Sequence, residues 1–400
     1  MHKYHNALGV AQTLRPTQPV TLVRPHAAMR AARFFMDRFP GTSMYAVKAN
    51  PAPDLIRSLW DAGITHFDVA SIAEVRLVRS VAPTATLCFM HPVKGPEAIA
   101  EAYHQHGVRV FSLDSLAEID KIVEATRTDG VAAADLTLCV RIRVSSSHSK
   151  LSLASKFGVA ADEAAPVLMA ARQVADALGI CFHVGSQAMS AQAYGDAMAQ
   201  VRAAIVSAGV TVDIVDVGGG FPSHYPGMEP PALDSYFEVI HRAFESLPIS
   251  YSAELWCEPG RALCAEYASV LVRVEARKDD VLYINDGAYG ALFDAAHIDW
   301  RFPVSLVRET ASRARTLPFS FYGPTCDDMD YMRGPFDLPA DIQAGDYIEI
   351  GMLGAYGSAM RTGFNGFTAG DTVLVRDEPM ETVYDVIETT QDNVIKLRKN

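Results

Sequence analysis

Short runs of apolar residues, many of them β-branched or aromatic, alternate with amphipathic stretches from about residue 42 onward. In order, the runs are SMYAVKA, HFDVA, TLCFM, RVFSL, LTLCVRIRV, ICFHVG, VDIVDVG and SAELWCEPG. The stretches between them carry apolar residues at three- and four-residue spacing, which predicts helices over residues 71–82, 95–107, 115–126, 164–179 and 233–247. Strands that alternate with helices at a pitch of roughly thirty residues predict parallel strand pairing. Eight such units predict a closed (β/α)8 barrel of the TIM type.

The pattern changes after about residue 262. There SVLVRVEARKDD, VLYIND, DYIEIG, TVLVRDE and TVYDVIE predict strands that are separated by Gly and Asp turns, without long helices between them. The run VTLV, residues 20–23, precedes the first barrel strand and could pair with this C-terminal sheet. We therefore predict a barrel domain over residues 25–262, and a β-sandwich or β-barrel domain built from residues 1–24 and 263–400.

Size, composition and charge fit a globular protein with two domains. A chain of 400 residues is long enough for a large core, and 49% apolar with 20% charged residues is typical of a soluble folded protein. The formal net charge of −12 argues against nucleic acid or an anionic membrane as the main partner, because both need clustered Lys and Arg. A small cationic substrate fits better. No apolar run is long enough to span a membrane, and the N-terminus lacks the apolar core of a signal peptide, so we expect a cytoplasmic location.

The six cysteines indicate neither a zinc site nor a disulfide framework, and we predict no metal centre. They show no C-x-x-C spacing, and most lie in apolar runs, where free cysteine behaves as a small hydrophobe. Cys326 is the exception, because YGPTCDDMD surrounds it with turn formers and carboxylates.

Polar residues stand where the predicted barrel strands end. They are Lys48, Asp68, Ser71, His183, Ser186, Gly218 to Gly220, Glu258 and Arg261. Each has a structural alternative: Asp68 or Ser71 could cap the next helix, the histidine could be a core residue, and the glutamate and arginine could form an ion pair. Because the active site of a barrel lies at the C-terminal ends of its strands, the combination predicts one functional site.

The stretch DVGGGFP suggests which chemistry this site performs. It is neither a dinucleotide fingerprint nor a Walker loop, and an isolated glycine triplet could be only a tight turn. Three consecutive glycines also let backbone amides approach a phosphate. A phosphate cradle, a lysine, a histidine and an acid are the groups that pyridoxal 5'-phosphate requires: the lysine binds its aldehyde, the imidazole stacks on its ring and the acid keeps its pyridine nitrogen protonated.

The chain resembles the fold type III, alanine racemase-like group of pyridoxal phosphate enzymes, and within it the eukaryotic-type ornithine/lysine decarboxylases, from about residue 20 to 367. The matching stretches are YAVKAN, FDVASIAE, FSLDSLAEI, SKFG, FHVGSQ, DVGGGFP, EPGR, INDGAYG, YGPTCDDMD and GAYGSAMRTGFNGF. The resemblance implies a catalytic set of Lys48, His183, Glu258 and Cys326. It implies that the cofactor is bound by Lys48, Asp68, His183, Ser186, Gly218, Gly219, Gly220, Glu258, Gly260, Arg261 and Tyr356.

The resemblance also implies a homodimer with shared active sites. In that family the GPTCD loop, which carries Cys326 and Asp327 here, reaches into the neighbouring subunit, and its thiol returns a proton to the substrate carbon. The substrate would be bound by Asp294, Asp327, Tyr289 and Phe364, and the two carboxylates would bind its distal ammonium.

A basic amino acid is therefore the expected substrate. L-Ornithine, which gives putrescine for polyamine biosynthesis, leads, and L-lysine, which gives cadaverine, follows, because they differ by one methylene, worth about 1 to 3 kcal/mol. Diaminopimelate ranks lower, because its decarboxylases usually have C-E-S in the cysteine loop. A decarboxylase of a D-amino acid, a racemase and a non-catalytic homologue like the antizyme inhibitors are further alternatives. Two features depart from the family: a short connection between INDGAYG and FDAAH, and the sequence SLAS at residues 152–155, whereas eukaryotic relatives commonly carry an arginine a few residues before KFG.

Overall fold

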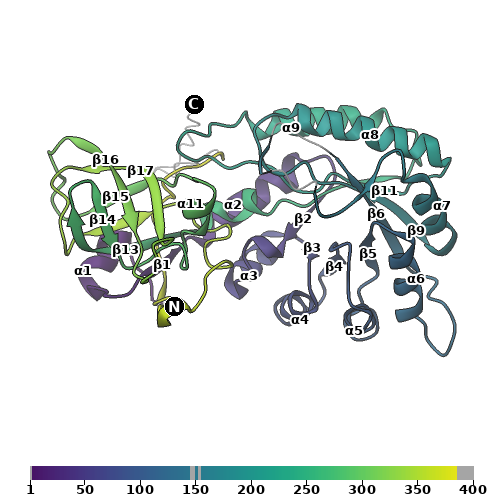
Figure 1. Cartoon of the computed structure of the whole chain (residues 1–400). Helices are drawn as coiled ribbons and strands as arrows, with labels where there is room; N and C mark the ends of the chain where they lie inside the picture. The colour runs from purple at the N-terminus through teal and green to yellow at the C-terminus, as the bar shows by residue number, and fades with distance from the viewer. Residues whose placement is uncertain (1, 145–148, 152–154, 385–400) are drawn as a thin grey trace, which may run out of the picture.

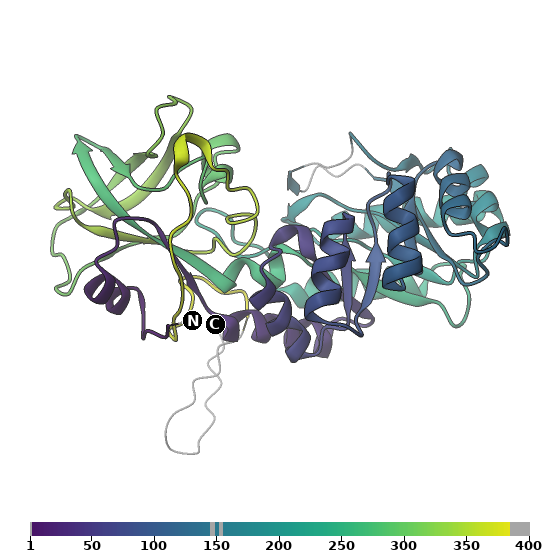
Figure 2. The same cartoon turned by 90° about the horizontal axis from the view of Figure 1, so that it is seen from below.

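The computed structural model describes residues 2–144, 149–151 and 155–384. Two lobes lie side by side, one built from parallel strands with helices around them and the other mainly from antiparallel strands (Figures 1 and 2). The barrel strands are β2 (Thr42–Ala46), β3 (His66–Val69), β4 (Thr86–Phe89), β5 (Val110–Leu113), β6 (Thr137–Arg143), β9 (Ala177–Cys181), β11 (Ile214–Asp216) and β12 (Glu254–Cys257). Neighbouring strands pair in parallel, and the pairs β5–β6 and β12–β2 close the ring. The predicted barrel is thus confirmed.

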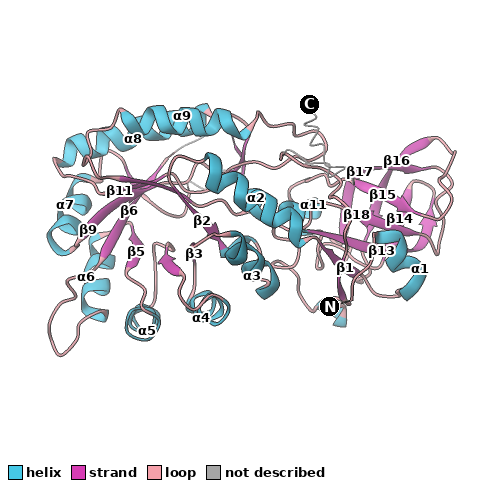
Figure 3. Cartoon of the chain, turned by 180° about the vertical axis from the view of Figure 1, so that it is seen from behind, coloured by secondary structure: helices cyan, strands magenta, loops and turns pink. Residues whose placement is uncertain are grey.

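Helices follow the barrel strands and cover the outside of the ring (Figure 3). They are α2 (Pro25–Arg38), α3 (Pro53–Ala62), α4 (Ile72–Val81), α5 (Pro96–His106), α6 (Leu116–Ala125), α7 (Ala165–Val174), α8 (Gln192–Ala208) and α9 (Leu233–Glu245). Their starts follow capping chemistry: Ser71 and Ser115 are N-caps whose side chains accept from the N–H groups of Glu74 and Glu118. For Ser71 the structural alternative is therefore the observed one.

One predicted helix is too long. The pattern over residues 164–179 predicts a single helix, but α7 ends at Val174 and β9 begins at Ala177. The alanine-rich sequence there fits a helix, yet the N–H of Ala177 donates to the carbonyl of Leu136, so the chain turns into the barrel and pairs with β6. Strand pairing inside the barrel outweighs the local helix propensity.

The second lobe holds an eight-stranded sheet. Its strands are β1 (Val20–Val23), β13 (Ala268–Lys278), β14 (Val281–Ile284), β15 (Val304–Val307), β16 (Thr316–Tyr322), β17 (Tyr331–Pro339), β18 (Tyr347–Ile350) and β19 (Thr372–Leu374). The run VTLV is β1, which pairs with β13 as the sequence suggested. The sequence pattern did not predict β15, β16 and β17. The predicted strand TVYDVIE extends beyond Tyr384 and so lies partly outside the described residues.

Buried apolar residues of both lobes form one large cluster, and a second cluster fills the barrel interior. The interior cluster consists of Met44, Cys88, Met90, Val110, Cys139, Cys181, Ile214 and Trp256. Five cysteines are buried and Cys326 is exposed, as the sequence context suggested. Within the described ranges, no helix is long and apolar enough to cross a membrane.

Candidate active site

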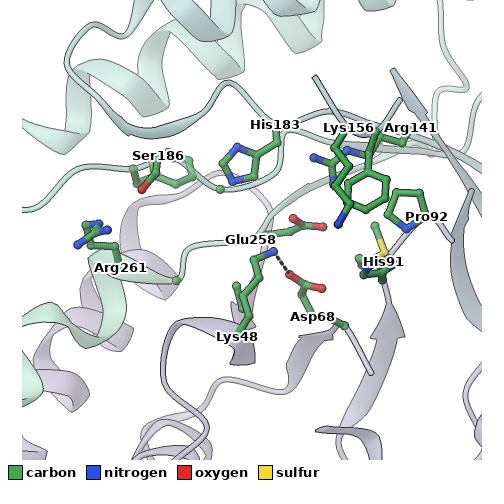
Figure 4. Close-up of a pocket in the computed structure, with 18 of the residues that line it drawn as sticks. Lys48, Asp68, His91, Pro92, Arg141, Lys156, His183, Ser186, Glu258 and Arg261 are labelled. Carbon is green, nitrogen blue, oxygen red and sulfur yellow. Dashed lines mark hydrogen bonds and ion pairs between the residues drawn. The ribbon is translucent and has the colours of Figure 1, made fainter. Parts of the chain in front are cut away.

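Lys48 reaches into a cavity at the C-terminal end of the barrel. It lies in a single turn of 3₁₀ helix, η1 (Val47–Ala49), directly after β2. Its Nζ donates to Oδ2 of the buried Asp68 at 3.0 Å (Figure 4). Burial lowers the pKa of Lys48, but the carboxylates of Asp68 and Glu258 outweigh this effect and raise it above the ordinary value. The amine is therefore held as an ammonium that has a carboxylate beside it to take its proton.

The cavity has a volume of about 390 Å³ and collects most of the residues named from the sequence. Those that line it are Lys48, Asp68, His183, Ser186, Gly219, Gly220, Glu258, Gly260, Arg261 and Tyr356. They come from the ends of several barrel strands and, in the case of Tyr356, from the segment after β18. Gly218 lies behind this lining, where its carbonyl accepts from the N–H of Glu258.

The glycine triplet after β11 has no room for side chains. A Cβ on Gly218 would lie 2.0 Å from the carbonyl oxygen of Phe182, and one on Gly220 would lie 2.5 Å from that of Gly185. Gly218 and Gly220 also have positive φ angles, of 69° and 107°, which favour glycine. At Gly219 a Cβ would lie 2.7 Å from the carbonyl oxygen of Glu258. The bare backbone therefore borders the cavity and suits the close approach of an anion.

Arg261 lies at the same end of the cavity in an aromatic cage. Its Nη1 donates to the hydroxyl of Tyr225 at 3.0 Å, and the guanidinium carbon lies 4.3 Å from the ring centre of Trp300 and 5.1 Å from that of Tyr356. Its Nε is buried and has no hydrogen-bond partner among the described residues. The side chain of Arg261 is only 4% exposed, so this cation is fixed in place with donors to spare. It can receive a phosphate.

Asp294, expected to bind substrate, lies beside Arg261 instead of lining the cavity. Its Oδ2 is 3.6 Å from Nη2 of Arg261, a long ion pair. Burial raises the pKa of Asp294, although the charge of Arg261 opposes the change.

His183 is a neutral imidazole at the cavity wall. Its Nδ1 accepts from the N–H of Gly185 at 3.0 Å, which leaves the ring proton on Nε2. Burial, reinforced by the charges of Lys48 and Arg141, holds the pKa of His183 well below its ordinary value. A neutral aromatic ring at this position can cover the face of a flat ligand.

Glu258 is buried and is in contact with a second buried carboxyl, that of Asp216, which the sequence reasoning missed. Burial and the charge of Asp216 raise the pKa of Glu258 well above its ordinary value, and burial raises that of Asp216 to about 6. A carboxyl that keeps its proton near neutral pH can hold a proton at a ring nitrogen.

Sequence reasoning also missed His91, Arg141 and Lys156, which lie across the cavity from Arg261 (Figure 4), and Phe157, which also lines the cavity. The ring of His91 packs edge-on against that of Phe157, with centres 4.9 Å apart. Arg141 lies in the run LTLCVRIRV, Lys156 and Phe157 lie in SKFG, and His91 comes directly after the run TLCFM. A polar residue that ends a barrel strand, such as His91, was the available signal.

The cysteine loop lies elsewhere in the same chain. Cys326 is exposed, and its N–H donates to Oδ1 of Asn365 at 3.1 Å. Asp327 accepts from the hydroxyl of Tyr289, whose ring centre is 4.7 Å from that of Phe364. Cys326 and Asp327 line a separate cavity of about 770 Å³ that Lys48 does not reach. One chain therefore does not bring Cys326, Asp327, Tyr289 and Phe364 to the lysine.

Comparison with known proteins places the chain among pyridoxal-dependent decarboxylases. The model of the family described as pyridoxal-dependent decarboxylase, pyridoxal binding domain, matches residues 25–265. The chain is 32% identical over 344 residues to the lysine/ornithine decarboxylase of Selenomonas ruminantium, with 84% of each chain covered. It is 30% identical to antizyme inhibitor 2 of Xenopus laevis, with 81% of this chain and 73% of the relative covered. The arginine decarboxylase of Paramecium bursaria Chlorella virus bound to agmatine superposes with a TM-score of 0.80 at 26% identity, over 92% of this chain and 98% of the other.

Proposed function

The chain belongs to the pyridoxal-dependent decarboxylases, and we propose that within this family it decarboxylates L-ornithine in preference to L-lysine. The observation that carries the assignment to an enzyme is the Lys48–Asp68 pair, which faces Glu258 in a cavity that has Arg261 and bare glycine backbone at its other end. The cofactor is pyridoxal 5'-phosphate. Its fit rests on three features of the chain: the buried Nε of Arg261 that lacks a partner, the lack of room for any Cβ at the glycines, and the amine of Lys48 inside the cavity.

Each residue of the cavity has a separate role in binding the cofactor or in moving a proton. When bound, pyridoxal phosphate supplies a protonated ring that accepts the electron pair released when carbon dioxide leaves the amino acid. Arg261 and the glycine backbone bind the phosphate, and the neutral ring of His183 covers one face of the site. Lys48 would hold the aldehyde carbon, and Asp68 would take and return the proton of the lysine amine. Glu258 holds a proton at the ring nitrogen.

The last proton transfer calls for a second copy of the chain. Cys326 is exposed and does not line the cavity of Lys48, so its thiol would have to come from a partner subunit. Apolar side chains near the loop, Met329, Phe364 and Phe367, are 65%, 41% and 46% exposed. Such side chains gathered around a loop suit burial in an interface. We therefore assign the protein to a homodimer in which each cavity receives the cysteine loop of the other subunit.

Mixing of subunits tests this assignment. Lys48→Ala and Cys326→Ala proteins should each be inactive, and activity should return after subunit exchange, because a mixed dimer carries one intact site. A mixture of Lys48→Ala with Glu258→Gln subunits is the matched control and should stay inactive when combined, since both changes lie in the same cavity and leave no complete site. Lack of recovery in the first mixture, with exchange verified, would contradict the shared site.

The substrate preference follows from the distal end of the amino acid. Asp327 of the loop carries a carboxylate for a distal ammonium, whereas Asp294 is engaged by Arg261. Release of carbon dioxide should be measured with L-ornithine, L-lysine, L-arginine, meso-diaminopimelate and D-ornithine, with added cofactor. We expect L-ornithine to be the best substrate and L-lysine to follow within about 10- to 200-fold, the range for one methylene.

Other outcomes of this assay are informative. A better rate with L-lysine or L-arginine would refute the preference but leave the decarboxylase in place. If none of the five released carbon dioxide while the protein bound the cofactor, a racemase would have to be tested by following the optical rotation of the same amino acids. Failure to bind the cofactor would favour a non-catalytic homologue, and the 30% identity to antizyme inhibitor 2 is the observation behind this alternative.

A further inference from the structure

Asp216 is a buried carboxyl behind the cavity to which the proposed mechanism gives no role. It is the last residue of β11, it is 0% exposed, and its neighbour in the barrel is β12, the strand that leads to Glu258. Its Oδ1 accepts from the N–H of Gly218 at 2.8 Å. Its Oδ2 is buried and receives no hydrogen bond from any donor in the described ranges. The side chain in contact with it is the carboxyl of Glu258.

This contact requires a proton. Two ionised carboxylates have no hydrogen to share and repel each other, whereas one proton between them makes a hydrogen bond and satisfies the free oxygen of Asp216. The other charged groups that face the pair are Asp68, Lys48 and Arg141, and Lys48 is already engaged by Asp68. Around the pair lie the thiols of Cys88, Cys139, Cys181 and Cys257. None of these thiols lies within hydrogen-bonding reach of the free oxygen.

We propose that Asp216 is a positioning residue that shares one proton with Glu258 and thereby keeps the ring nitrogen of the cofactor protonated. This inference rests on the proposed function, in which Glu258 faces that nitrogen. With Asp216 present, the pair's proton can move onto Asp216, and Glu258 then faces the ring N–H as a carboxylate. If Asp216 loses the proton, its negative charge holds the ring proton more tightly. Without Asp216, one negative charge fewer can form beside the ring N–H, and the ring nitrogen holds its proton less tightly.

The variant Asp216→Asn tests this role with little change of shape, because its carbonyl oxygen can still accept from Gly218 and its amide can donate to Glu258. The direct measurement is the ¹⁵N chemical shift of cofactor labelled at the ring nitrogen, recorded on the holoenzyme by solid-state NMR between pH 6 and 10. We expect the midpoint of ring deprotonation to lie at least about one pH unit lower in the variant than in the wild type, a tenfold loss of proton affinity. Equal midpoints would overturn the proposal.

The cofactor-free protein gives an independent measurement. A carboxyl whose pKa is higher in the folded than in the unfolded chain stabilises the fold less as pH rises above its unfolded value, near 4, because the proton must be released. The melting temperature of wild type should therefore fall more steeply between pH 5 and 8 than that of Asp216→Asn. Identical slopes would refute the shared proton.

Glu266→Gln is the matched control. Glu266 is a buried carboxyl bonded to Arg30 and Thr382, and burial raises its pKa to about 7. Its replacement should also flatten the pH dependence of stability, but should leave the ring nitrogen unchanged. If the midpoint of ring deprotonation shifts equally in Glu266→Gln, the effect is a general structural one and the proposal is refuted.

If Asp216→Asn does not fold, infrared spectroscopy of the cofactor-free wild type replaces it. A band of a neutral buried carboxyl that persists at pH 8 and disappears in Glu258→Gln is expected, and a missing band would count against the shared proton. The proposed function is tested separately, by measuring carbon dioxide release by the wild-type protein. A wild type that decarboxylates normally beside an Asp216→Asn protein with unchanged ring titration would remove only this inference.

Discussion

Arg261 offers the sharpest test of how the cavity separates cofactor binding from folding. In the cofactor-free protein its cation is buried, with one hydrogen bond to Tyr225, the ring faces of Trp300 and Tyr356, and a long ion pair to Asp294. The charged hydrogen bond contributes about 1.5 to 3 kcal/mol, and the aromatic contacts about 1 to 2 kcal/mol. Burial of the guanidinium costs several kcal/mol. These opposing contributions nearly cancel.

The substitution Arg261→Met should therefore change the stability of the cofactor-free protein by no more than about 1 kcal/mol. The loss of a charge-assisted contact to phosphate should weaken cofactor binding by about 3 kcal/mol, or about two orders of magnitude in Kd. Arg261→Lys should fall between, because lysine keeps the charge but not the planar fork of donors.

The assay titrates cofactor-free protein with pyridoxal phosphate and, separately, with pyridoxal, which lacks the phosphate. Wild type and Arg261→Met should bind pyridoxal with the same affinity, so that the whole difference appears with the phosphate present. Thermal unfolding without ligand gives the stability. A variant that weakens pyridoxal as much as pyridoxal phosphate would refute a phosphate role for Arg261, and a large loss of stability would refute the balance of burial and aromatic contacts.

Two further predictions use the other walls of the cavity. Gly219→Ala should reduce cofactor affinity by at least tenfold, because the new Cβ would lie 2.7 Å from the carbonyl oxygen of Glu258 and 3.1 Å from Nε2 of His183. Equilibrium titration with the cofactor measures this loss. The control is Gly227→Ala, at an exposed residue that has open space for a Cβ but a positive φ, and it gives the size of a purely local backbone effect on stability. The pKa of His183 is lowered by burial, so its contribution to stability is complete above its unfolded value near 6.5 and is lost as pH falls below it, by up to about 1.4 kcal/mol per pH unit. Urea unfolding at several pH values should show that the free energy of unfolding falls less steeply below pH 6.5 in His183→Phe than in wild type. Equal slopes would contradict a neutral buried imidazole.

The barrel was predictable because its strands are largely buried on both faces and so read as short runs rich in apolar residues. The end of α7 was not, since an alanine-rich segment fits a helix and only the pairing of Ala177 with β6 turns it into a strand. The strands β16 and β17 carry internal prolines, Pro318 and Pro335, which hide the alternation of a strand, and β15 is only 4 residues long.

The site was predictable only where its residues are polar residues or glycines at the ends of predicted strands. Lys48, Glu258 and the glycines did so, and they line or support one cavity. Asp216 lies inside the run VDIVDVG, and nothing in the sequence shows that its side chain contacts Glu258, which follows the neighbouring strand β12. Asp294 matched a family position, yet its distance to Arg261 depends on how the short loop before it folds. Local sequence identifies a group, whereas its partner is set by the tertiary fold.

Six buried side-chain atoms lack a hydrogen-bond partner among the described residues, and two of them belong to charged groups of the proposed cofactor site. Nε of Arg261 and Oδ2 of Asp216 lie on two sides of the cavity region and belong to groups of opposite charge. A fold that served stability alone would pair or remove such groups, because each costs about 1 to 3 kcal/mol when left unsatisfied. A ligand that brings an anion to Arg261 relieves the cost at its Nε, whereas the proton shared with Glu258 satisfies Oδ2 of Asp216. Cofactor binding should therefore stabilise the folded protein, and its melting temperature should rise with the logarithm of one plus the free cofactor concentration over Kd.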